Sequence, residues 1–417
     1  MSPIALSWFK GKQRGGGRRA PTPTTIRWGG PTGPIIPQAN QYTYMGVVLH
    51  NTCEWGAQLE LATEKVVQKF NQLTTSLRSR GISGDVKCML LGAVARPTME
   101  WGGGVWHPHA TGMKTVDSVF MQLCKSAFHC PPSTSHLALV QELGIRPMST
   151  WFDKRMLEFW HRIYSMDDSR IVKQVIFGTE LENVRRRPGR RKETWLDKVR
   201  KVMDVWEIDE ARAQQLDYNQ FKRLLTKQLP KVVEKRLRAE EVDSPVLRTY
   251  NTHFKADELQ FKKPKKFLCG GPCSRGKELV IQLRTQALPL ASLTGKFGRR
   301  RRDNPDDPAH FICPVCSGGT ESISHFLLEC EGYQALRQSL YDDLAVAAPR
   351  EWEEMNGLSL DEKAFKMLAD ESWGEDSNVV ADLIAPFVYK CWQHRIDVVH
   401  AELPPQGAVV DGSNAMA

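Results

Sequence analysis

The chain lacks any apolar run close to the ~18 residues that a membrane-spanning helix needs. Its N-terminus has a short apolar start followed by basic residues, whereas a secretory signal has these two parts in the reverse order. Aspartate and glutamate are both absent from the first forty residues. We therefore predict an intracellular protein, nuclear or cytoplasmic, that is not secreted and has no membrane partner.

Cysteine is sparse, with 10 residues in a chain of 417. Disulfide frameworks belong to small secreted domains, so the sequence favours reduced thiols. The 57 lysines and arginines exceed the 48 acidic residues and give a formal net charge of +9. This balance favours polyanionic partners, although it does not specify a fold.

Apolar residues recur at steps of three and four along most of the chain, which predicts a mainly α-helical protein. Alternation of apolar and polar residues is confined to the N-terminal part. There we expect a strand over residues 42–50 and a short hairpin within 24–37, with Gly29-Gly30 or Gly33 at its turn. Helices are expected over 59–77, from 83 or 84 to 96, where Pro97 ends or kinks the helix, and over 114–128.

One segment has the ligand spacing of a metal site, Cys-x2-Cys-x8-His-x4-Cys. A Cys-x2-Cys turn presents two thiolates from one tight knuckle, and four protein ligands leave no open coordination position. The pattern therefore predicts a structural Zn²⁺ ion as the cofactor. The alternative is three buried cysteines and a core histidine. The four expected ligands are Cys313, Cys316, His325 and Cys330.

We expect Thr320 or Ser322 to cap a helix that carries His325 in its first turns. His325 and Cys330 are five residues apart and so do not share one face of an α-helix. Gly332 would let the helix unwind and return Cys330 to the metal. Cys269 and Cys273 are more consistent with ordinary turn cysteines than with a second metal site.

Three basic runs are candidates for sequence-independent, salt-sensitive contacts with RNA or DNA phosphates. The alternative for each run is a solvated linker, and the first run also fits a nuclear-import signal. The residues are Arg185, Arg186, Arg187, Arg190, Arg191 and Lys192; Lys262, Lys263, Lys265 and Lys266; and Arg299, Arg300, Arg301 and Arg302.

Several stretches, taken in order, resemble the C-terminal part of a non-LTR retrotransposon (LINE-type) reverse transcriptase. "YTYMGVVLHNTCEW" is similar to the Y-x-Y-L-G-V strand of these proteins, with Met45 in place of Leu. "RPTMEWGGGVWHP" is similar to their P-x-x-x-Y-G-x-x-x-W segment, with Trp101 in place of Tyr. "LALVQELGIRPM", the Cys/His segment with its preceding "LRTQALPLASL", and "CWQHR" also match. The resemblance covers about residues 20 to 400.

The resemblance implies a helical thumb-like bundle with a short N-terminal β-hairpin, basic linkers, and a small Cys-Cys-His-Cys zinc module packed with C-terminal helices. The implied divisions are a disordered basic N-terminus at 1–23, palm-edge strands and a thumb-like region at 24–184, a basic linker with charged helices at 185–265, the zinc-binding domain and C-terminal helices at 266–402, and a disordered tail at 403–417.

In this family, polymerisation depends on an aromatic-x-Asp-Asp motif upstream of the Y-x-Y-L-G-V strand, and here no acidic residue precedes Tyr42. The resemblance therefore implies a truncated, non-enzymatic fragment that contacts retrotransposon RNA or target DNA. Alternatives are a domesticated protein whose zinc module binds a protein partner, and an intact polymerase with a degenerate site. We expect solvated carboxylates at the three Asp-Asp pairs, Asp167-Asp168, Asp306-Asp307 and Asp342-Asp343.

Overall fold

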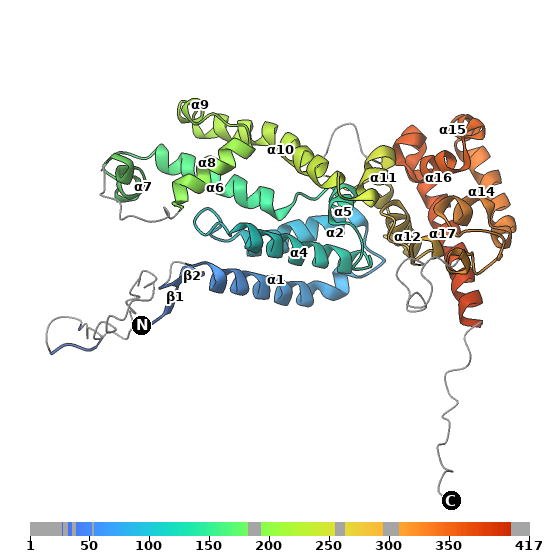
Figure 1. The fold of residues 1–417 in the computed structure, drawn as a ribbon, viewed down its shortest axis with the longest axis horizontal. Coiled ribbons are helices and arrows are strands. Elements are labelled where there is room, and N and C mark those ends of the chain that lie inside the picture. The colour runs from blue at the N-terminus through green and yellow to red at the C-terminus, as the bar shows by residue number, and fades with distance from the viewer. Residues whose placement is uncertain are drawn as a thin grey trace, which may run out of the picture. The chain divides into compact units, whose positions relative to one another are not determined.

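The computed structural model describes residues 27, 32–35, 39–51, 54–181, 193–254, 263–294 and 308–401. These residues are mainly α-helical, as the apolar spacing predicts (Figure 1). They form two compact units that alternate along the chain. Unit 1 takes its described residues from Met1–Leu77, Lys87–Ala127 and Ile145–Ala239, and unit 2 takes them from Arg78–Val86, Phe128–Gly144 and Glu240–Ala417. Within the described part, no helix is long and apolar enough to cross a bilayer.

Unit 1 begins with an antiparallel hairpin of β1 (Gln41–Tyr44) and β2 (Val47–His50), in which Tyr44 pairs with Val47. The strand predicted over 42–50 is therefore two strands divided at Met45-Gly46, and the short N-terminal β-hairpin of the predicted fold class is confirmed. Met45 (φ 49°) and Gly46 (φ 80°) both have positive φ, as the central residues of a type I′ hairpin turn do. The bridge Arg27↔Ile35 falls within the hairpin predicted at 24–37, whose Gly29-Gly30 lies outside the described residues.

The helix expected to end or kink at Pro97 takes a different course. Helix α2 (Gly84–Leu90) continues through a π-helix (Leu91–Ala95) into α3 (Arg96–Glu100). Pro97 occupies the first turn of α3, directly after the π-helix. The π-helix thus lets the chain pass the proline without ending the helical run. The other helices that lie wholly or mainly in unit 1 are α1 (Gly56–Leu77), α4 (Ala110–Ala127), α6 (Met148–Tyr164), α7 (Ile171–Leu181), α8 (Trp195–Val205), α9 (Glu210–Gln214) and α10 (Tyr218–Glu241).

The core of unit 1 lies between α1, α4 and α6, and it buries the apolar stripes that the sequence spacing predicts. Asp153 on α6 is buried inside this unit and joins three elements. It accepts hydrogen bonds from Trp206 Nε1 (3.2 Å) and from Arg236 Nη2 (2.8 Å), and His107 Nε2 lies 3.0 Å from its other oxygen. The Arg236 contact fixes α10 against α6, so the outer face of α10 is held in a defined position.

Unit 2 is also helical, and α12 packs against the long C-terminal helix α17. A β-carbon added to Gly276 would lie 2.0 Å from the carbonyl oxygen of Ala385, so only glycine permits this approach. The helices of unit 2 are α5 (His136–Leu143), α11 (Pro245–Phe254), α12 (Arg275–Arg284), α13 (Ala291–Thr294), α14 (Gln334–Ala347), α15 (Pro349–Glu354), α16 (Leu360–Leu368) and α17 (Ser377–Ala401).

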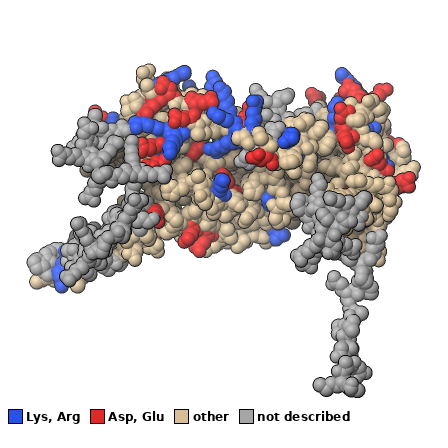
Figure 2. All heavy atoms as spheres, viewed as in Figure 1, with Lys and Arg blue, Asp and Glu red and all other residues tan. Residues whose placement is uncertain are grey.

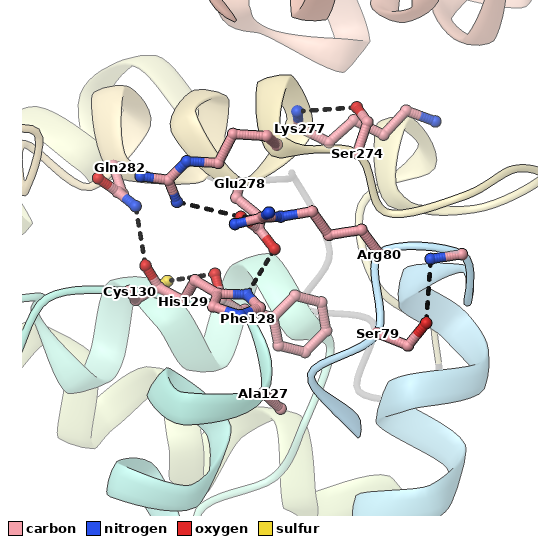
Figure 3. Close-up of polar contacts among 12 residues, drawn as sticks. Ser79, Arg80, Ala127, Phe128, His129, Cys130, Ser274, Lys277, Glu278 and Gln282 are labelled. Atoms are coloured by element: carbon pink, nitrogen blue, oxygen red, sulfur yellow. Dashed lines mark hydrogen bonds and ion pairs between the residues drawn. The ribbon is translucent and has the colours of Figure 1, made fainter. Parts of the chain in front are cut away.

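Buried Glu278 ties the early segments of unit 2 to α12 (Figure 3). Its carboxylate lies 3.3 Å from Arg80 Nε, 3.1 Å from Arg275 Nη1 and 2.5 Å from His129 Nδ1. Gln282 Nε2 donates to the carbonyl oxygen of His129 at 2.9 Å. The Glu278 carboxylate is fully buried and needs such partners, because burial of an unpaired charge costs free energy.

Candidate metal centre and basic surfaces

The segment after Phe311 forms a tight knuckle around its first two cysteines. The amide of Cys313 donates to the carbonyl of Gly319 (2.8 Å), and the amide of Ser317 donates to the carbonyl of Cys313 (3.0 Å). Gly318 N donates to Cys316 Sγ at 3.4 Å. Ser317 has a positive φ of 52°, which turns the chain back within this short loop. These bonds direct both thiol groups to the same side.

His325 and Cys330 are placed by a π-helix over His325–Glu329. Ser322 Oγ accepts a hydrogen bond from the His325 amide (3.0 Å), which confirms Ser322 as a cap. The Cys330 amide donates to the His325 carbonyl at 2.9 Å, an i→i+5 bond. In an α-helix these side chains would point roughly 140° apart. Here the π-turn ends at Glu329 and Cys330 has already left the helical conformation (φ −55°, ψ 118°), so the two ligands converge without sharing a face of an α-helix.

The four side chains converge on one point. Each offers one ligand atom, and all four atoms lie within 4.8 Å of one another. Cys313 Sγ is 3.8 Å from Cys330 Sγ, and Cys316 Sγ is 3.3 Å from His325 Nε2. The predicted cluster is thus confirmed as a group that can hold a metal ion.

The electrostatics of the cluster oppose free thiolates. Burial raises the pKa of the Cys313 thiol, and burial together with the neighbouring Cys313 raises the pKa of Cys330 to about 12. A cation between the sulfurs supplies the charge that favours the thiolate form, because metal ligation displaces the thiol proton. The donor set of three sulfurs and one imidazole nitrogen therefore fits a metal ion.

A second layer of contacts holds the backbone around the cluster. Arg337 Nη2 donates to the carbonyl of Cys330 at 2.6 Å, and its Nε donates to the carbonyl of Leu327 at 3.1 Å. Gly332 lies against the knuckle, and a β-carbon there would be 2.4 Å from Cγ1 of Val315. Gly332 therefore permits the close packing of the two ligand-bearing segments, a role beyond the unwinding expected from the sequence.

Cys269 and Cys273 belong to no such cluster among the residues that the structure describes. Cys269 Sγ lies 3.6 Å from the carbonyl oxygen of Lys265. Cys273 is fully buried, and its amide donates to the carbonyl of Ile82 at 3.0 Å. Their contacts are those of packed turn cysteines.

The basic runs are only partly within the described residues. Arg185–Lys192, Lys262 and Arg299–Arg302 lie outside them. Lys263 is exposed, whereas Lys265 Nζ donates to the carbonyl of Phe254 (2.9 Å) and Lys266 Nζ donates to that of Gly374 (3.2 Å). The role of these runs in nucleic-acid binding stays a prediction.

Helix α10 carries a basic stripe that the sequence reasoning did not single out. Arg223, Lys227, Lys231 and Lys235 are exposed and follow one another at steps of four residues. Figure 2 shows lysine and arginine side chains over the part of unit 1 that contains α10. The signal was present in the sequence as an i, i+4 series, the spacing that places side chains along one side of a helix.

The Asp-Asp pairs within the described residues lie on the surface. Asp342 and Asp343 are exposed on α14, and Gln338 donates to Asp342 at 2.9 Å. Asp167 and Asp168 are exposed after α6, and Lys173 Nζ lies 2.7 Å from Asp168. Asp306-Asp307 lies outside the described residues.

Comparisons of the chain with protein-family models, curated proteins and solved structures find no match.

Proposed function

We propose that this chain binds nucleic acid as the thumb-like and zinc-bearing part of a non-LTR retrotransposon reverse transcriptase. The order of the motifs from "YTYMGVVLH" to "CWQHR" supports the family assignment. The basic stripe of α10 is the observation that carries the binding function, because it offers several cations along one line.

The packing of helix α10 leaves these cations exposed. Phe221, Leu225 and Leu229 are buried, so the apolar side of the helix packs into unit 1. The opposite side carries the stripe, whose steps of four residues correspond to about 6 Å each along the axis. Lys235 lies 3.4 Å from Glu207, whereas its three predecessors have no ion pair among the residues described. Three cations without a carboxylate partner in the described structure are therefore available to phosphate groups.

We propose Zn²⁺ as the ion at the cluster, in a structural role. In a tetrahedron the distance between ligands is about 1.6 times the bond length, so Zn–S bonds of ~2.3 Å place two sulfurs ~3.8 Å apart. The Cys313–Cys330 separation of 3.8 Å equals this value. Four protein ligands leave no position for a reacting water, and the binding energy then supports folding.

Polymerisation is not part of this proposal. The exposed pair Asp342-Asp343 lies on α14, where consecutive side chains point roughly 100° apart. Two-metal catalysis requires carboxylates that converge on the same ions. We expect no template-dependent nucleotide incorporation by the purified chain with Mg²⁺ or Mn²⁺.

The test is the salt dependence of binding to RNA and DNA oligonucleotides, measured by fluorescence anisotropy. Each phosphate contact should make the fall of log affinity with log salt steeper by about 0.7–0.9. A total slope of several units supports the proposal. Absence of binding at low salt, or an affinity insensitive to salt, would contradict it and favour a protein-interaction role for the metal module.

A further inference from the structure

Trp101 in unit 1 is a large aromatic side chain that remains 61% exposed. Its orientation is nevertheless fixed, because the indole Nε1 donates to the carbonyl of Met45 at 2.8 Å. The neighbouring Trp106 is buried and donates to the carbonyl of Trp101 at 2.6 Å. An exposed ring held at both its edge and its backbone is a rigid platform, and binding to it requires little further ordering.

The hairpin turn closes in on this ring. A β-carbon added to Gly46 would lie 3.1 Å from Nε1 of Trp101, and Gly46 has a positive φ of 80°. Both facts make glycine the residue that allows the turn to approach the ring edge. The turn therefore holds the indole by its edge.

Two hollows meet at Pro97 and Trp101. The first has a volume of about 410 Å³ and is lined by the hairpin turn and by α1, including Lys65 and Lys69. The second, of about 420 Å³, is lined by the glycine-rich turn after Trp101 and by α6. Trp101 thus belongs to the walls of both.

The two hollows differ in charge. The lining of the first contains two exposed lysines, Lys65 and Lys69, and no carboxylate. The second contains two carboxylates, Glu100 and Glu158, and two cations, Arg155 and Arg162. Arg155 lies 2.9 Å from Glu100 and 3.4 Å from Glu158, so the formal charges of this lining cancel. An anion is accordingly favoured in the first hollow.

We propose that this first hollow binds single-stranded nucleic acid, with an unpaired base stacked on Trp101 and adjacent phosphates on Lys65 and Lys69. An aromatic face next to cations is the arrangement by which proteins hold single strands. Bases inside a duplex are covered by their neighbours on both faces, so an exposed indole favours an unpaired base over one within a duplex. This inference rests on the proposed nucleic-acid function and names a site and a strand state for it.

The probe is a fluorescein-labelled oligo(dT) of about 12 nucleotides. Trp101→Ala should weaken its binding roughly 5- to 150-fold. Trp101→Phe, which keeps a ring, should retain most of the affinity. The Lys65→Gln/Lys69→Gln variant should reduce the steepness of the salt dependence by about 1.4, the value for two phosphate contacts on a single strand. Lys366→Gln, an exposed lysine of unit 2, is the single-charge control and should change little.

Photocrosslinking provides a measurement that needs no variant. An oligonucleotide with 5-iodouracil in place of thymine should crosslink to Trp101, as located by peptide mass spectrometry. The proposal would be overturned if Trp101→Ala left the oligo(dT) affinity unchanged, or if all crosslinks mapped to other residues. A protein segment would then be the expected occupant of the hollow. If Trp101→Ala leaves the affinity unchanged but replacement of the α10 cations by glutamine still weakens oligonucleotide binding, the nucleic-acid function stands without this site. Failure of the wild type to bind any nucleic acid removes both.

Discussion

The Cys330 amide donates a hydrogen bond to the carbonyl of His325, five residues earlier, at 2.9 Å. This i→i+5 contact belongs to a π-turn that brings the two ligand atoms together, whereas an α-helix would point the side chains roughly 140° apart. The proposed zinc site therefore depends on a backbone irregularity as much as on the identity of its ligands.

Loss of one ligand should remove the metal. Cys316→Ser is expected to reduce bound zinc from one equivalent to a small fraction, because a neutral hydroxyl replaces a thiolate. The midpoint of thermal unfolding should fall together with the metal content. Metal analysis of purified protein and calorimetry measure the two effects.

Cys88→Ser provides the control, because Cys88 lies outside the cluster. This variant should keep one equivalent of zinc. Equal metal content in the Cys316 and Cys88 variants would show that the cluster does not bind the ion.

The close approach of Gly332 to Val315 can be tested by a double-mutant cycle. Gly332→Ala should lower the free energy of unfolding by about 1–3 kcal/mol, because its new methyl group overlaps Val315 Cγ1. Val315→Ala removes that atom and should relieve part of the loss in the double variant. Urea unfolding of the four proteins gives the coupling. Strictly additive losses would mean that the two residues do not meet.

Asp117 on α4 gives a pH-dependent prediction. Desolvation raises the pKa of its carboxyl in the folded protein above the ordinary value, although the Ser149 amide donates to it at 3.1 Å. The folded state then binds the proton more tightly than the unfolded state does. The Asp117 carboxyl therefore contributes to the free energy of unfolding below its unfolded pKa of ~3.9. This contribution is lost as the pH rises through the raised pKa of the folded state.

Asp117→Asn should remove the loss of stability that ionisation of Asp117 causes, while it keeps an acceptor for the Ser149 amide. The free energy of unfolding of the wild type should therefore decline more than that of the variant as the pH is raised from about 4 to 7. Parallel pH profiles for the two proteins would contradict the raised pKa.

The helices and the four metal ligands could be predicted from sequence because both depend on local spacing. The buried faces of α1, α4 and α6 follow three- and four-residue steps, and the Cys-x2-Cys knuckle has its own turn chemistry. The course of the backbone at three places did not follow from spacing. These places are the methionine at positive φ, the helix that continues past Pro97 and the π-turn at His325. At two of them a side chain from another segment holds the backbone: Trp101 donates to the carbonyl of Met45, and Arg337 donates to the carbonyls of Leu327 and Cys330.

The same limit applies to the candidate binding surfaces. Runs of consecutive cations are conspicuous in a sequence, yet Lys265 and Lys266 donate to backbone carbonyls within unit 2. The α10 stripe follows an i, i+4 series in the sequence, but its exposure, like that of the Trp101 ring, is fixed only when other parts of the element are buried. Exposure is a property of the packed unit, and periodicity alone does not report it.

The most direct test of the nucleic-acid function compares two variants with equal changes of charge. One carries Arg223→Gln, Lys227→Gln and Lys231→Gln on α10, and the other carries Arg350→Gln, Lys366→Gln and Lys390→Gln at exposed positions of unit 2. If α10 contacts phosphates, the first variant should bind oligonucleotides more weakly and lower the steepness of the log affinity–log salt plot by about 2 to 3. The second should remain close to the wild type. Equal slopes for the two variants would contradict the assignment of α10 as the binding surface.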